Sequence, residues 1–199
     1  MQNIRYRYIQ NQVLNAYKYY RISSFPINMT EVLKCTPHCL SYTYREFAEI
    51  NNVNVNDVSA MGKSDTGYSI FRPDTNKYLI LYNDDMCPGR INWTIAHELG
   101  HIYLRHLSDK ITSDKSVDLS LFYESEADAF AQMFLAPFPL FDILNIKSVQ
   151  DVMQICGLSH EAALHTYMQY NSWKRSHIKT AFEADLKNTF QINECFYFA

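Results

Sequence analysis

The spacing of apolar residues along the chain predicts helices over most of its length. Between residues 90 and 105, apolar side chains recur at intervals of three and four, which is the period of one helix face. A second strong helix is predicted over 121–136, where Pro137 and Pro139 then prevent its continuation. Shorter helices are predicted within 1–22 and over 30–34, 43–49, 148–156, 160–170 and 173–186.

Capping and turn residues predict where some of these elements begin and end. Thr43 followed by Glu46 has the spacing of a capping box, and Ser159 is placed to cap the helix at 160–170. Two β-prone runs, 68–72 and 77–82, flank a Pro-Asp-Thr-Asn turn and predict a β-hairpin.

The sequence contains no repeat and no linker, so these elements predict a single α+β unit. The expected fold is mostly helical, with a small antiparallel sheet or hairpin beside the helix at 90–105. The polar stretch 108–118 is predicted to be a mobile loop.

Composition narrows the class of protein. Of the 199 residues, 47% are hydrophobic and 20% are charged, which favours a packed core over disorder. The net charge of −3 provides no broad basic face, so direct binding of nucleic acid is not expected. The apolar runs are far shorter than the roughly 20 residues of a membrane span, and no secretory signal is visible, so no membrane association is expected. The five scattered cysteines favour reduced thiols and a cytoplasmic location.

One motif carries specific chemistry. The sequence H-E-L-G-H at 97–101 matches H-E-x-x-H and lies within a predicted helix. Residues four apart share a helix face, so the imidazoles of His97 and His101 can reach one metal ion. Glu98 can then direct its carboxylate towards a water molecule at the metal and act as the catalytic base. The alternative for the motif alone is a surface helix with two solvated histidines.

The helix at 121–136 offers further ligands. Glu124 and Asp128 are four residues apart, so one can complete the metal site while the other accepts a hydrogen bond from a ligand imidazole. Alanines surround these acids, which indicates a closely packed helix rather than a solvated acidic face. Glu126 is displaced from Glu124 by about 200° around the helix, so both cannot face the metal. Spacing alone leaves the choice between them open.

Together, the sequences R-I-N-W-T-I-A-H-E-L-G-H at 90–101 and E-S-E-A-D-A-F-A at 124–131 resemble the ImmA/IrrE family of metallopeptidases. The resemblance covers 1–172 as a metallopeptidase domain and leaves 173–199 as a C-terminal helix and aromatic tail without a role. It implies a minimal zincin-like fold of the gluzincin type, with one zinc ion per chain. A metzincin pattern is excluded, because leucines stand at 104 and 107 where glycine and histidine would be required.

The resemblance also implies which residues hold the zinc ion. The ligands are His97, His101 and a downstream glutamate, and the E-x-x-x-D register of gluzincins favours Glu124. Asp128 then holds a ligand imidazole, and Glu126 faces solvent or a salt bridge.

The implied activity is that of a zinc-dependent endopeptidase that hydrolyses a peptide bond with metal-activated water. Members of the family are associated with site-specific cleavage of helix-turn-helix repressors, so a repressor-type protein is the expected substrate. His106 and Tyr103 are candidate donors to the transition state, with a packing role as the alternative. The edge of the hairpin at 68–82 could pair with an extended peptide, with a purely structural role as the alternative. The alternative function is a zinc-binding regulatory module that binds a protein partner without cleaving it, and manganese or iron could take the place of zinc.

Overall fold

A computed structural model describes residues 3–107, 117–176 and 179–190 of the chain. Of the predicted loop at 108–118, residues 108–116 lie outside this part, and so does the aromatic tail.

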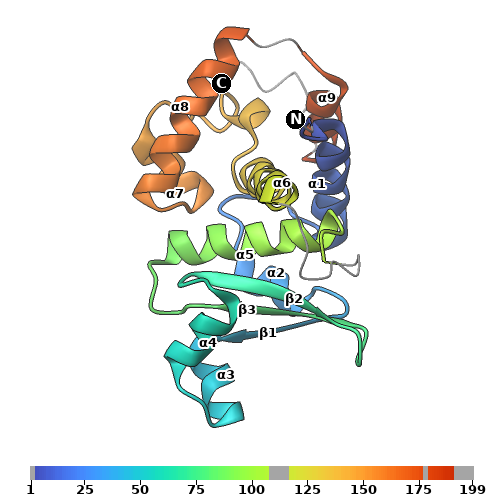
Figure 1. The fold of residues 1–199 in the computed structure, drawn as a ribbon. Helices are drawn as coiled ribbons and strands as arrows, with labels where there is room; N and C mark the ends of the chain where they lie inside the picture. The colour runs from blue at the N-terminus through green and yellow to red at the C-terminus, as the bar shows by residue number, and fades with distance from the viewer. Residues whose placement is uncertain (1–2, 108–116, 177–178, 191–199) are drawn as a thin grey trace.

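Within the described residues, the chain forms helices on both sides of one three-stranded sheet, which confirms the predicted α+β, mostly helical class (Figure 1). None of the described helices is both long enough and apolar enough to cross a membrane. In chain order, the elements are α1 Tyr6–Tyr20, α2 Met29–Lys34, β1 Cys39–Thr43, α3 Tyr44–Asn51, α4 Val55–Gly62, β2 Gly67–Arg72, β3 Lys77–Tyr82, α5 Pro88–Tyr103, α6 Val117–Leu135, the 3-10 turn η1 Phe138–Leu140, α7 Val149–Cys156, α8 His160–Ser176 and α9 Ala181–Thr189.

The sheet has the strand order β1-β3-β2 and is mixed. β2 and β3 form the predicted antiparallel hairpin, with Ser69 opposite Ile80. β1 pairs in parallel with β3, placing Leu40 opposite Leu79. The sequence did not predict β1, a short strand whose five residues are all half-buried. β2 is an edge strand of the described sheet.

The central strand β3 separates two apolar cores. Ile80 belongs to the large core formed with α1, α2, α5 and α6, whereas Leu79 and Leu81 belong to a smaller core with Tyr44 and Val58 of α3 and α4. This alternation follows from the two-residue period of a strand. Figure 1 shows α5 lying across one face of the sheet, with α3 and α4 on the other. One face of the sheet therefore packs against α5.

Several local predictions are confirmed. The Thr43 hydroxyl accepts a hydrogen bond of 3.1 Å from the backbone N–H of Glu46, whose carboxylate accepts one of 2.8 Å in return. This capping box starts α3. Ser159 accepts a hydrogen bond of 3.4 Å from the backbone N–H of Ala162 at the start of α8.

The C-terminal helices differ from the prediction. No separate helix begins at 173, because α8 continues to Ser176 and α9 starts at Ala181. A capping box formed by Thr180 and Glu183 fixes the start of α9. The division of the chain into 1–172 and 173–199 stays a prediction.

Gly100 allows α5 and α6 to pack closely. A Cβ at this position would lie 3.2 Å from the Cα and the carbonyl oxygen of Ala127, and equally close to Cβ of Phe130. Backbone atoms cannot move aside as a flexible side chain can, so a residue without a side chain is needed for this approach. The contact brings the H-E-x-x-H turn of α5 directly against the acidic turns of α6.

Candidate metal centre

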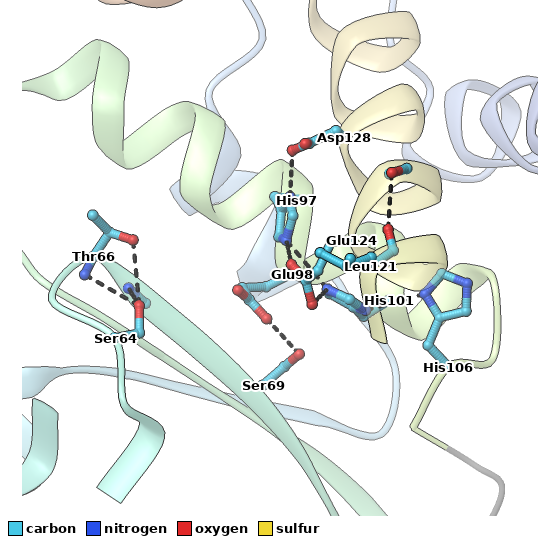
Figure 2. Close-up of polar contacts among 12 residues, drawn as sticks. Ser64, Thr66, Ser69, His97, Glu98, His101, His106, Leu121, Glu124 and Asp128 are labelled. Atoms are coloured by element: carbon cyan, nitrogen blue, oxygen red, sulfur yellow. Dashed lines mark hydrogen bonds and ion pairs between the residues drawn. The ribbon is translucent and has the colours of Figure 1, made fainter. Parts of the chain in front are cut away.

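Three side chains from α5 and α6 converge on one point (Figure 2). His97 and His101 lie one turn apart on α5, and their Nε2 atoms are 3.2 Å from each other. Glu124 of α6 places Oε2 3.1 Å from Nε2 of His97 and Oε1 3.6 Å from Nε2 of His101. The structure thus brings together the three residues that the sequence predicts as ligands.

This cluster fits a divalent metal ion. The ligand atoms of His97, His101 and Glu124 all lie within 4.8 Å of one another. Two imidazole nitrogens and one carboxylate oxygen are the three protein ligands of a typical catalytic zinc site, which keeps a fourth position open. Within the described part of the chain, no second such group of histidine, cysteine and acidic residues occurs.

Asp128 orients the first imidazole. Its Oδ1 lies 2.9 Å from Nδ1 of His97, so the ring turns Nε2 towards the cluster, as predicted for a partner of a ligand histidine. Burial lowers the pKa of His97, but the hydrogen bonds to Asp128 and Glu124 more than offset burial and raise this pKa to about 10. The neighbouring imidazoles of His101 and His97 hold the pKa of Glu124 well below its usual range. Without a metal ion, a proton on His97 therefore neutralises part of the acidic charge.

A histidine, and not an acid, orients the second imidazole. Nδ1 of His101 lies 3.1 Å from Nδ1 of His106, and Nε2 of His106 lies 3.1 Å from Oε2 of Glu126. The His106 ring is 2% exposed and stacks on Tyr123 at 4.2 Å. Burial lowers the pKa of His106 to about 4, so the ring is neutral at pH 7.

This arrangement corrects two expectations about transition-state donors. Both ring nitrogens of His106 are engaged inside the protein, and the residue does not line the cleft over the metal centre. Tyr103 stacks on Phe130 at 5.5 Å and is likewise absent from the cleft wall. The structure therefore offers neither side chain as a donor to a reacting carbonyl.

Glu126 faces away from the ligand cluster and is fully buried. Its carboxylate is paired with Arg5, whose Nε lies 2.9 Å from Oε1 and whose Nη2 lies 2.5 Å from Oε2. Burial raises the pKa of Glu126, but the hydrogen bonds from Arg5 outweigh burial and lower it. Of the two expected environments for Glu126, the structure shows the salt bridge and not solvent.

Ser69 holds the predicted catalytic base. Glu98 is 7% exposed, and its Oε2 accepts a hydrogen bond of 2.6 Å from the Ser69 hydroxyl (Figure 2). Ser69 stands opposite Ile80 in the hairpin, so the two side chains share the sheet face that is covered by α5. Sequence reasoning missed Ser69, since its role depends on strand register and on the packing of α5.

A cleft of about 500 Å³ opens over the cluster. Gly67 lets the edge strand approach α5, because a Cβ there would lie 2.5 Å from Cγ2 of Thr94. A neighbouring cavity of about 570 Å³ shares Trp93 and Asp128 with the cleft. The walls of this second cavity include Met133, Phe138, Trp173 and Phe182.

Fold and site together define the class of protein. A helix that carries H-E-x-x-H, joined by a carboxylate from a second helix, is the arrangement of a metallopeptidase. Residues 48–168 match the family model Peptidase_M78, described as the IrrE N-terminal-like domain, and the chain belongs to this family. The resemblance found in the sequence is thereby confirmed. No curated protein matches the chain.

Proposed function

We propose that the protein is a zinc-dependent endopeptidase that cuts a peptide bond within a protein substrate. The observation that carries this proposal is the position of Glu98, which is buried beside the three-ligand cluster and held by a hydroxyl from the edge strand. A site that only binds metal needs no such carboxylate. Membership in a peptidase family supports the same conclusion.

His97, His101 and Glu124 would hold the metal ion. A divalent ion bound there supplies Lewis-acid chemistry, which polarises a carbonyl group and lowers the pKa of water. Glu98 accepts the proton of the attacking water and delivers it to the leaving amine. The hydrogen bond from Ser69 to Oε2 of Glu98 fixes the orientation of this carboxylate.

The substrate binds in extended form along β2. This edge strand borders the cleft through Gly67, Tyr68 and Ser69, and its outer backbone groups can pair with a peptide. The adjoining cavity at Trp93 accepts apolar side chains of the substrate. From the resemblance, we propose a helix-turn-helix repressor as the natural substrate.

The decisive experiment compares wild type with Glu98→Gln. A repressor encoded near this gene is incubated with each protein and zinc, and its fragments are identified by mass spectrometry. We expect one defined cut with wild type, no cut with Glu98→Gln, and equal zinc content in both. Glu49→Gln, a change at an exposed position of α3, is the matched control and should cut normally. Inactivation of the repressor by Glu98→Gln would instead establish a zinc-binding module that acts without cleavage.

A further inference from the structure

A continuous chain of contacts leads from the N-terminal segment to the metal centre. Arg5 pairs with Glu126, Glu126 contacts Nε2 of His106 at 3.1 Å, and Nδ1 of His106 contacts Nδ1 of His101 at 3.1 Å. Arg5 precedes α1 and lies outside residues 48–168, the range matched by the family model. The metal centre is therefore connected to a part of the chain that the family match does not include.

The two middle residues of this series of contacts, Glu126 and His106, are shielded from water. Glu126 is 0% exposed and His106 is 2% exposed. Buried polar groups need partners within the protein, because solvent cannot replace a lost hydrogen bond. Each of these two side chains therefore constrains the protonation pattern of its neighbour. His97 differs, because its partner Asp128 has a side chain that is 59% exposed.

The contacts assign a tautomer to each ring. The carboxylate of Glu126, paired with Arg5, can only accept hydrogen bonds, so Nε2 of His106 carries a proton. A neutral imidazole has one donor and one acceptor, which makes Nδ1 of His106 the acceptor. Nδ1 of His101 must then donate. Its Nε2 is left with a free lone pair that faces Nε2 of His97 and Glu124.

Arg5 keeps Glu126 as a buried carboxylate that can accept a hydrogen bond from His106. Its guanidinium pairs with both carboxylate oxygens, and its backbone N–H donates a further hydrogen bond of 2.9 Å to Oε1. Without this cation, the buried carboxylate loses its compensation and turns towards water. The acceptor for Nε2–H of His106 is then lost.

We propose that Arg5 is a positioning residue of the metal centre, which acts through Glu126 and His106 to hold His101 in the tautomer that binds metal through Nε2. This inference rests on the proposed metal site. It assigns the segment before α1 a role in metal affinity, because partners behind a ligand histidine fix its orientation and raise its basicity.

The test measures the tautomer and the metal affinity separately. Imidazole ¹⁵N NMR of the metal-free protein reports which nitrogen of His101 carries the proton, and chelator competition gives the zinc affinity. In wild type we expect the Nδ1–H form of His101. Arg5→Met should mix the two tautomers and weaken zinc binding by about 10- to 100-fold. Arg7→Met, at an exposed position two residues along, is the control and should change neither quantity.

Two double variants cover the case in which Arg5→Met alone does not fold. Arg5→Met combined with Glu126→Gln keeps an acceptor for His106, whereas Arg5→Met combined with Glu126→Leu removes it. Neither double variant has a buried charge at position 126. The comparison therefore tests whether residue 126 must offer His106 a hydrogen-bond acceptor. We expect the glutamine variant to retain the Nδ1–H form of His101 and near wild-type affinity, and the leucine variant to lose both.

The outcomes separate this inference from the proposed function. Equal His101 tautomers and equal zinc affinities in the two double variants would overturn the role of the contacts from Glu126 through His106 to His101. Unchanged values in a folded Arg5→Met would overturn the role of Arg5. A wild-type protein that binds no zinc would instead refute the proposed function.

Discussion

The hydroxyl of Ser69 donates a hydrogen bond of 2.6 Å to Oε2 of Glu98 and so connects the edge strand to the proposed catalytic base. The two residues lie 29 positions apart in the sequence and meet because β2 packs against α5. The strand that we propose to bind the substrate therefore also orients Glu98, the proposed proton acceptor.

Replacing Ser69 by alanine should slow cleavage and leave metal binding unchanged. A hydrogen bond to a charged group contributes about 1.5–3 kcal/mol, which corresponds to a roughly 10- to 100-fold loss in kcat/KM. Steady-state cleavage of the repressor together with zinc content measures both effects. A loss of zinc in Ser69→Ala would show that the contact supports the metal site and not the base.

Glu124 should be essential for metal binding. Glu124→Gln should reduce zinc affinity by more than the roughly 10- to 100-fold expected when a partner behind a ligand is lost, because it removes a ligand charge. Elemental mass spectrometry after dialysis measures the retained zinc. Glu161→Gln, at an exposed position of α8, serves as the control. Full zinc retention by Glu124→Gln would move the third ligand elsewhere.

Metal binding should release a proton from His97. Because the pKa of this ring is raised to about 10 in the metal-free protein, His97 is protonated at neutral pH, and the ion must displace that proton. Zinc affinity should therefore rise with pH up to about 10. Calorimetry in buffers of different ionisation enthalpy counts the released protons.

Asp128→Asn isolates the source of this effect. Loss of the carboxylate removes one of the hydrogen bonds that raise the pKa of His97, so fewer protons should be released at pH 8. The same change should weaken zinc binding by about 10- to 100-fold, because the ring loses its orienting partner. An unchanged proton count would show that Asp128 does not control this titration.

Gly100→Ala should loosen the packing of α5 against α6. Alanine favours a helix by about 1 kcal/mol over glycine, but overpacking against Ala127 costs about 1–3 kcal/mol, so we expect net destabilisation. Urea unfolding in the presence of a chelator measures the change in the free energy of unfolding. Zinc affinity should fall as well, because the ligands lie on both helices. A more stable variant would mean that α6 accommodates the added methyl group.

Sequence patterns predicted the elements whose signals are local. The apolar periodicity of α5 and α6, the turn of the hairpin and the Thr43 capping box each depend on residues within a few positions. β1 and α4 were missed. β1 is only five residues long, and its pairing with β3 depends on a partner far along the chain.

The residues of the site likewise fall into those that local sequence signals predict and those that they do not. The spacing within α5 placed His97 and His101 on one helix face, and the family resemblance selected Glu124 over Glu126 on α6. The partners behind them could not be predicted, because Arg5 reaches Glu126 across 121 positions and Ser69 reaches Glu98 through strand register. A histidine that supports another histidine, such as His106, has no distinguishing spacing.

The close contact at Gly100 has a thermodynamic consequence. Since His97 and His101 lie on α5 and Glu124 lies on α6, an ion held among them cross-links two helices of the main core. Binding to the folded state alone would stabilise it by about 2.7 kcal/mol at a free metal concentration 100 times Kd. The free metal concentration would then set the stability of the folded protein as well as the occupancy of its site.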